Sequence, residues 1–115
     1  MSSGHGDHLL VKDQLVIGDD QGLISYDPST GTELVRFLGH DGPVRSVSLH
    51  PNGMSMASGG TDKSVRVWDT GEGSQSYCFE TGRRVTSVAF SPQHQLAMAF
   101  ADSQIMISDM REPRV

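Results

Sequence analysis

Three side chains of the sequence could together perform nucleophilic chemistry, and they are His40, Ser58 and Asp62. In a catalytic triad a carboxylate orients an imidazole, which takes the proton of a serine hydroxyl as that hydroxyl attacks a carbonyl carbon. Such an enzyme also needs hydrogen-bond donors for the developing oxyanion, and no donors of this kind are evident in the sequence. A hydrolase is therefore a hypothesis that lacks an assembled site.

A second segment, Gly59-Gly-Thr-Asp-Lys-Ser64, has some of the residues of a phosphate-binding loop. A Walker-type loop places a glycine directly before the Lys-Ser pair and a helix after it. Here Asp62 precedes Lys63 and a strand is predicted to follow. The segment is interpreted as a β-turn, and no nucleotide is expected to bind.

The sequence gives little support for a metal site or for a reactive thiol. His5, Asp7 and His8 could supply metal ligands, but they belong to a small, polar, Gly-rich start that offers no fixed geometry. Cys78 is the single cysteine, without a CxxC motif or a paired histidine to activate it. We expect no cofactor and no metal site.

The segment from Gly39 to Asp69 contains His40, Ser58 and Asp62, and its residue pattern predicts β-strands. Three runs of alternating apolar residues, at 44–50, 54–59 and 64–69, are separated by turn-forming residues. Pro51-Asn-Gly53 predicts a hairpin, because Asn-Gly accepts the positive φ values of the reversal. Further strands are predicted at 14–17, 23–26, 33–38, 76–80, 85–90, 96–100 and 105–109.

The same pattern recurs along the chain. The windows Leu15–Asp27, Ala57–Asp69 and Ala97–Asp109 end 42 and 40 residues apart, and VRSVSLHP at 44–51 matches VTSVAFSP at 85–92 with an offset of 41. These offsets lie close to the repeat length of about 40–45 residues of a WD40 blade. Together with Gly39-His40 and Trp68-Asp69 they make the chain resemble the WD40-repeat family, with one complete and two partial repeats.

The resemblance implies an all-β fold, a partial β-propeller of about 2.5 four-stranded antiparallel blades that this chain alone does not close. The expected parts are a flexible tail at 1–8, an incomplete first blade at 9–38 without an innermost strand, and a complete blade at 39–80. A third blade at 81–110 lacks its outer strand, and a tail follows at 111–115. Met56 and Met98 are expected in the core.

The resemblance also assigns His40, Ser58, Asp62 and Trp68 to the hydrogen-bonded tetrad of WD40 blades, which is structural. There the serine and aspartate fix the histidine, which is linked to the indole N–H. In the flanking units Val16 and Met98 are aligned with the serine, Tyr26 and Ser108 with the tryptophan, and Arg83 lies near the position of the histidine. Ser108-Asp-Met-Arg111 lacks the tryptophan of the ending that some family members use to dock on ubiquitin-ligase adaptors.

In propellers of this type, partner peptides dock on one rim of the central channel. The residues of this chain that map to the rim are Pro43, Arg45, Thr61, Arg84, Thr86 and Asp19. Arginines there would favour acidic or phosphorylated peptides through charge-assisted bonds. Ordinary solvated loop residues are the alternative interpretation of each position.

Length and charge narrow the function further. A closed propeller needs about four blades of some 40 residues, roughly 160 in all, and the chain has 115. The net charge of −5 argues against a nucleic-acid or membrane-surface role, and no apolar run is long enough to span a membrane. One cysteine suits an intracellular compartment, cytoplasm or nucleus.

We therefore expect a non-catalytic scaffold for protein–protein interaction. The alternative is a structural subunit of a large complex, in which another chain or self-association completes the partial propeller. Either would need further blades, from a partner or from a longer parent chain.

Overall fold

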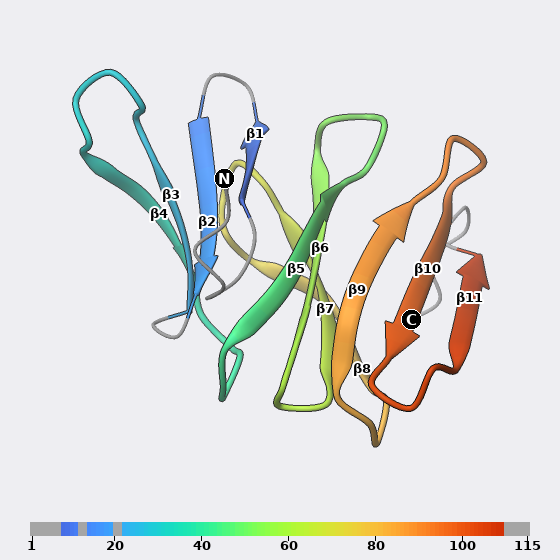
Figure 1. Ribbon diagram of the computed structural model, residues 1–115. Coiled ribbons are helices and arrows are strands. Elements are labelled where there is room, and N and C mark those ends of the chain that lie inside the picture. Colours follow the sequence, from blue (N-terminus) through green and yellow to red (C-terminus); the bar gives the residue numbers. More distant parts are fainter. Residues whose placement is uncertain (1–7, 12–13, 20–21, 110–115) are drawn as a thin grey trace.

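Eleven antiparallel strands form three separate sheets in the part of the chain that the computed structural model describes, residues 8–11, 14–19 and 22–109 (Figure 1). The sheet orders are β1-β2-β3-β4, β5-β6-β7-β8 and β11-β10-β9. No helix occurs among these residues. The prediction of an all-β fold made of four-stranded blades is confirmed, and each sheet is referred to below as a blade.

The strands of the first blade are β1 (His8–Val11), β2 (Gln14–Asp19), β3 (Gly22–Tyr26) and β4 (Glu33–Phe37). Those of the second blade are β5 (Val44–Leu49), β6 (Ser55–Gly60), β7 (Ser64–Asp69) and β8 (Gln75–Glu80). The third blade contains β9 (Val85–Phe90), β10 (Gln95–Phe100) and β11 (Ile105–Asp109).

The first blade differs from the expectation of an incomplete blade, because β1 fills the innermost position and pairs with β2 from His8↔Ile17 to Val11↔Gln14. Only two residues, Lys12 and Asp13, separate these strands, which is enough for a hairpin. The prediction was wrong because Lys-Asp lacks the Asn-Gly type of turn signal. His8 thus belongs to β1, and the rest of the two predicted tails lies outside the described residues.

The blades pack flank to flank through two apolar clusters. The first cluster lies between the first and second blades, with the ring of Phe37 edge-on to the indole of Trp68 at 5.7 Å between centroids. Its buried members are Val16, Leu23, Phe37, Val44, Val47, Met56 and Trp68. The blades therefore stabilise each other through the apolar area that they remove from water.

The second cluster joins the second blade to the third. Its buried members are Ala57, Val65, Val67, Val85, Val88, Leu96, Met98 and Phe100. Met56 and Met98 are both buried, at 0% and 1% exposure, so the prediction that they are core residues is confirmed. Strand β6 contributes to both clusters because its side chains alternate, so Met56 faces the first blade while Ala57 faces the third.

Side chains of the innermost strand β5 also bond to the backbone of β9. The amide of Val88 donates to Ser46 Oγ at 3.1 Å, and the amide of Phe90 donates to Ser48 Oγ at 3.0 Å. These two bonds fix the register between neighbouring blades as well as their distance.

The alignment of the first blade shifts by one residue within its hairpin. Val16 pairs with Ser25 and faces the second blade, and in the same way Ala57 faces the third blade. Val16 is therefore equivalent to Ala57, and Ile17 occupies the position of Ser58. Gly18 lies against Val44 as Gly59 lies against Val85, where any side chain would collide with the valine. The assignment of Val16 to the serine position was therefore wrong. The β2–β3 turn is one residue shorter than the β6–β7 turn, and a shift of one residue reverses the face.

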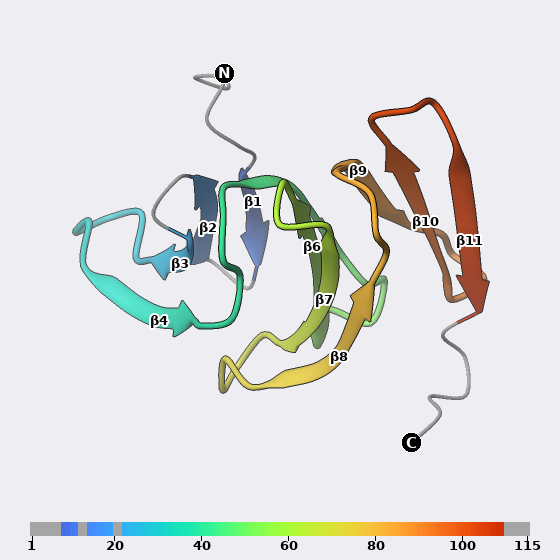
Figure 2. The ribbon, with the colours of Figure 1, turned by 90° about the horizontal axis from the view of Figure 1, so that it is seen from below.

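The three blades lie next to one another in chain order, and their innermost strands are β1, β5 and β9 (Figure 2). The arrangement is open, and the described residues do not close a ring. The prediction that this chain does not close a propeller by itself is confirmed.

Candidate functional site

The second blade brings the four predicted tetrad residues together from four places. His40 lies in the connection from β4 to β5, Ser58 in β6, Asp62 in the β6–β7 turn and Trp68 in β7. Ser58 and Trp68 face the same side of the sheet, because Met56 is paired with Trp68 and lies two residues before Ser58. Alternation in the two strands and one tight turn thus suffice to align the side chains.

One hydrogen-bonded chain runs through the four residues. Asp62 Oδ2 lies 2.9 Å from His40 Nδ1, and His40 Nε2 lies 2.7 Å from Ser58 Oγ. The indole Nε1–H of Trp68 donates to Ser58 Oγ at 2.8 Å. The indole N–H is therefore hydrogen-bonded to the serine and not to the histidine, whereas the family pattern suggested a link from histidine to indole.

The donor and acceptor chemistry of these groups determines where each proton lies. The carboxylate of Asp62 can only accept, so His40 carries its proton on Nδ1 and donates it to Asp62. The free Nε2 accepts from the hydroxyl of Ser58, whose oxygen in turn accepts from the indole. A neutral imidazole satisfies every bond in this chain.

The pKa values agree with this assignment. Burial lowers the pKa of His40, although the neighbouring Asp62 acts in the opposite direction. Burial by itself would raise the pKa of Asp62, but bonds donated by the Asp41 amide, His40 and Ser64 together hold that pKa below its usual value. The pair is therefore a neutral histidine beside an ionised aspartate near neutral pH.

Two further residues complete the cage around Asp62, and sequence reasoning missed both. Ser64 donates to Asp62 Oδ1 from its amide at 3.2 Å and from its hydroxyl at 2.9 Å. Arg66 donates from Nε to Ser64 Oγ at 3.2 Å. The Asp-x-Ser spacing was a usable signal, because an aspartate in a turn commonly accepts from the backbone two residues later.

The geometry of His40, Ser58 and Asp62 is that of a Ser-His-Asp triad, but its hydroxyl is closed off. Ser58 and Trp68 are fully buried, and the His40 side chain is 1% exposed. The oxygen that would attack a substrate already accepts the indole N–H. In this arrangement the hydroxyl has no access to a substrate carbonyl.

The third blade replaces the network with a more exposed pair. The guanidinium of Arg83 lies over the ring of Phe100 at 4.3 Å and 3.4 Å from a carboxylate oxygen of Asp102. Both charged side chains are more than a third exposed, so water screens their attraction. Met98 stands at the serine position and belongs to the apolar cluster.

The predicted rim residues lie at one end of the blades. Arg45 is the extra residue of a β-bulge between Val44↔Gly60 and Ser46↔Gly59, and Thr86 is the extra residue between Phe100↔Val85 and Ala99↔Ser87. A bulge turns a side chain out of the regular alternation, and both of these side chains are exposed. Equivalent bulges thus present one side chain from each of two adjacent innermost strands.

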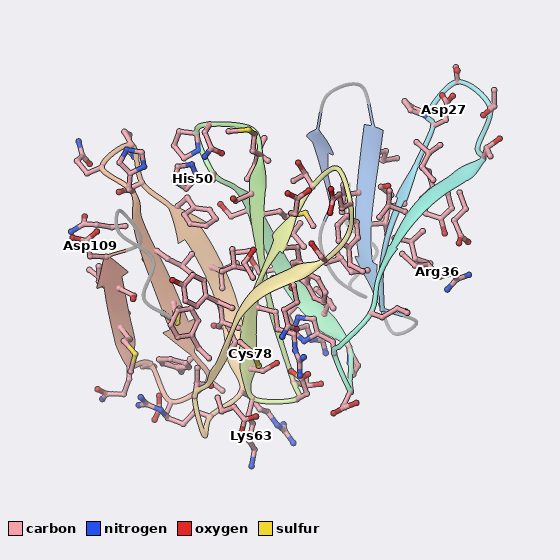
Figure 3. All side chains as sticks on the ribbon, turned by 180° about the vertical axis from the view of Figure 1, so that it is seen from behind. Asp27, Arg36, His50, Lys63, Cys78 and Asp109 are labelled. Atoms are coloured by element: carbon pink, nitrogen blue, oxygen red, sulfur yellow. The ribbon has the colours of Figure 1, made fainter. Side chains whose placement is uncertain are left out.

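The remaining rim residues lie in the loops at the same end. The amide of Thr61 donates to the Pro43 carbonyl at 3.1 Å, which joins two of these loops, and the Arg84 side chain is exposed. Asp19 ends β2, and nothing is described of its side chain. Figure 3 shows Lys63, from the β6–β7 turn, at this end of the molecule and His50 at the opposite end.

The other candidate motifs have simple structural roles. Residues 59 and 60 end β6, and the following turn brings Lys63 to a positive φ before β7 begins. Cys78 is an exposed free thiol on β8. Among the described residues no group of three metal-ligating side chains occurs, and no helix there is long and apolar enough to cross a membrane. His5 and Asp7 lie outside those residues.

Comparisons with known proteins match both sequence and fold. The family model for the WD domain, G-beta repeat, matches residues 31–69. The small ribosomal subunit protein RACK1 of Medicago sativa is 34% identical over 77 residues, which cover 67% of this chain and 24% of that protein. The ribosome biogenesis protein BOP1 homolog of Dictyostelium discoideum is 33% identical over 84 residues, 70% of this chain and 10% of that protein. The chain thus spans about a quarter or less of these relatives.

Two solved structures share the arrangement of the blades. The β-propeller domain of Cps50 (Swd1) from Myceliophteria thermophila matches with a TM-score of 0.84 and 25% identity, over 99% of this chain and 38% of that one. The WD40 β-propeller domain of Doa1 matches with a TM-score of 0.78 and 25% identity, over 83% and 32% of the two chains.

Proposed function

Because the chain belongs to the WD40-repeat family, we propose that it acts as a non-catalytic scaffold for protein–protein interaction. The observation that supports this most is the pair of equivalent bulges, which presents Arg45 and Thr86 from two adjacent innermost strands at one rim. Scaffold rigidity gives such loop residues their specificity. The tetrad has the role of holding the adjoining loop, since Asp62 binds both the amide of Asp41 and the ring of His40.

The burial of the network supports a non-catalytic role. Ser58 is closed to solvent and its hydroxyl is engaged on both sides, by His40 and by Trp68. Opening it to a substrate would leave a buried indole N–H without a partner, at a cost of about 1–3 kcal/mol. A satisfied polar network of this kind serves better to specify one packing of the blade.

The partner we propose is an acidic or phosphorylated peptide. Arg45, Arg84 and Lys63 are exposed at the rim, in a chain whose net charge is −5. A guanidinium binds a carboxylate or phosphate in a bidentate, charge-assisted manner. The relatives named above are called ribosomal and ribosome-biogenesis proteins, and their names support the proposal that this chain also belongs to an intracellular protein assembly.

Binding of fluorescent peptides tests this proposal. The full chain is titrated into matched peptides that carry serine or phosphoserine between acidic residues, at low and at high salt. We expect tighter binding of the phosphorylated peptide and weakening by salt, since surface charges are screened. Arg45→Ala with Arg84→Ala should weaken binding at least about tenfold, equivalent to roughly 1.4 kcal/mol.

Arg36→Ala is the matched control, because Arg36 is an exposed arginine of the outer strand β4, paired with Glu33. It should leave the affinity unchanged. Equal binding of both peptides would show that the phosphate is not recognised. Binding of neither peptide, or equal loss in the rim and control variants, would exclude the rim as the site. Ester hydrolysis by the wild type that His40→Ala abolishes without unfolding would overturn the non-catalytic assignment.

A second candidate is a structural subunit whose partial propeller is completed by another chain or by self-association. It is favoured by one flank of the third blade, where Ile105 is 70% exposed and Ile107 is 62% exposed. Apolar side chains of this size are unusual on a free surface when they lie together.

A further inference from the structure

The third blade has an aspartate, Asp102, at the position that Asp62 holds in the second blade. Each follows the end of the second strand of its blade by two residues. Their turns also have the same form, because Asp102 Oδ1 accepts the Gln104 amide at 3.1 Å, as Asp62 Oδ1 accepts the amide two residues later. The Asp102 side chain is 50% exposed, however, and that of Asp62 is 7% exposed. The third blade therefore presents at its surface a carboxylate that the second blade encloses.

Arg83 approaches this carboxylate from a short connection. The segment before β9 has four residues, 81–84, whereas the segment before β5 has six, 38–43. Arg83 Nη1 lies 3.4 Å from Asp102 Oδ2, and the central carbon of the guanidinium lies 4.3 Å from the ring centroid of Phe100. Because that ring is buried, at 3% exposure, it gives the guanidinium a platform that attracts cations. Arg83 is thus held in place at the rim while its side chain stays 37% exposed.

Two further cationic side chains come from the same loops. Thr81 donates from its amide and from its hydroxyl to the Lys63 carbonyl, at 2.9 and 2.8 Å, so the β6–β7 turn lies against the segment 81–84. The side chains of Lys63 and Arg84 are exposed, as is that of Glu80 at the end of β8. An anion bound by Arg83 therefore has two more cations in these loops, with Glu80 as an opposing charge.

The chemistry of the guanidinium favours an oxyanion as its ligand. A guanidinium carries five N–H donors in a planar fork, and Asp102 meets the fork of Arg83 through one nitrogen. Both side chains of this pair are partly exposed, and the attraction between exposed charges is weak. A phosphate brings more charge and three acceptor oxygens, and it can accept two bonds from one guanidinium. A phosphorylated side chain is therefore able to replace the carboxylate on Arg83.

We propose that Arg83 binds the phosphate of a phosphorylated peptide and that Asp102 competes with this phosphate for the guanidinium. In the free chain the carboxylate of Asp102 is paired with Arg83, and in the complex the phosphate displaces it. The inference rests on the proposed function and deepens it, because neither residue is among the rim residues predicted from the sequence. The rim thus contains an anion-binding residue together with its internal competitor.

Titration of the matched serine and phosphoserine peptides into the full chain tests the role of Arg83. Arg83→Gln keeps part of the apolar stem beside Phe100 and removes the charge. It should weaken binding of the phosphorylated peptide at least about tenfold, because a charge-assisted bond is lost. Arg83→Ala is a second variant with the same expected loss. The circular dichroism spectra of both variants should match that of the wild type, since the Arg83 side chain is more than a third exposed.

Asp102→Asn tests the competition. Asparagine keeps an oxygen that can accept the Gln104 amide, so the change removes the negative charge and leaves the turn intact. Binding of the phosphorylated peptide should become about two- to fivefold tighter, the range expected when an exposed ion pair no longer competes. In the Arg83→Gln background this gain should disappear, because the competition acts through Arg83.

Asp27→Asn is the matched control. Asp27 also accepts a backbone amide two residues later, from Ser29, and so caps a turn in the same way as Asp102. It lies between β3 and β4, at the opposite end of the molecule from Lys63 (Figure 3). The variant should bind the phosphorylated peptide with the affinity of the wild type.

The outcomes separate this inference from the proposed function. Unchanged binding in both Arg83 variants, while Arg45→Ala with Arg84→Ala loses affinity, would overturn this inference alone. The absence of a gain in Asp102→Asn, or a gain that persists without Arg83, would exclude the competition. A wild type that binds neither peptide would overturn the proposed function and this inference together.

Discussion

Ser58 is the residue on which the order of the second blade depends most. Its single hydroxyl donates to His40 and accepts from Trp68, and so connects a loop, two strands and a turn. All three side chains are buried, which makes each unmade bond expensive.

Ser58→Ala is predicted to lower the free energy of unfolding by about 2–6 kcal/mol. The change leaves both the Trp68 N–H and the His40 Nε2 buried without a partner, at about 1–3 kcal/mol each. Urea unfolding followed by the fluorescence of Trp68, the only tryptophan, measures it. Ser76→Ala, an exposed serine on β8, should change stability by no more than about 0.5 kcal/mol. A loss at Ser58 as small as that of the control would contradict the assigned network.

The sequence predicted which four residues form the tetrad, but not all of the contacts between them. His40, Ser58, Asp62 and Trp68 were selected by their positions in one repeat, and the structure joins them in one chain of bonds. The order of that chain and the role of Ser64 were not predicted. Strand alternation determines which face a residue occupies, but not which of two nearby acceptors an indole chooses.

The elements were predictable wherever a turn signal was strong. Pro51-Asn-Gly53 is the turn between β5 and β6, and the Gly53 φ of 75° is the conformation that glycine accepts without strain. The innermost strand β1 was missed, because four residues beside a Lys-Asp connection give neither a long alternation nor a turn signal. The shifted register of β2 was missed because equal window lengths concealed a turn that is one residue shorter.

The turns of the second and third blades meet through a pair of histidines. His94 Nδ1 lies 3.0 Å from His50 Nε2, and the rings stack with centroids 4.9 Å apart. The amide of Asn52 donates to His50 Nδ1, so the His50 proton is on Nε2 and is donated to His94. The pair is satisfied only while both rings are neutral.

Stability is therefore predicted to fall in mild acid. Burial and the repulsion from His94 lower the pKa of His50, and burial lowers the pKa of His40, both below the ordinary value of 6.5. The unfolded chain binds these protons more readily than the folded chain does. The contribution of these two histidines to stability is thus fully present above pH 6.5 and is lost as the pH falls below that value. Urea unfolding at pH 7.5, 6.5 and 5.5 measures the trend.

His50→Gln should flatten this profile in part, leaving the contribution of His40. At pH 7.5 the variant should itself be less stable by about 0.5–1.5 kcal/mol, the usual value of one neutral hydrogen bond. A wild type whose stability is constant or rises between pH 7.5 and 5.5 would show that the sign assigned to both histidines is wrong.

At the scale of the molecule, the open ring followed from length, since 115 residues are too few for four blades of about 40. What length could not show is which faces of the blades are buried between blades. That Ile105 and Ile107 repeat the covered Val65 and Val67 becomes visible only once burial separates the two blades. The rim has the same dependence, because its residues come from separate blades and act together only if those blades pack side by side.

The packing of consecutive blades is thus the claim on which the rim rests, and amide hydrogen exchange at β9 tests it most directly. The Val88 and Phe90 amides bond to Ser46 and Ser48 across the boundary between blades. We predict slow exchange at both amides in the wild type, with exchange at Val88 accelerated by Ser46→Ala and exchange at Phe90 accelerated by Ser48→Ala. Fast exchange at Val88 and Phe90 in a wild type whose other strand amides remain protected would show that the blades do not pack in this way.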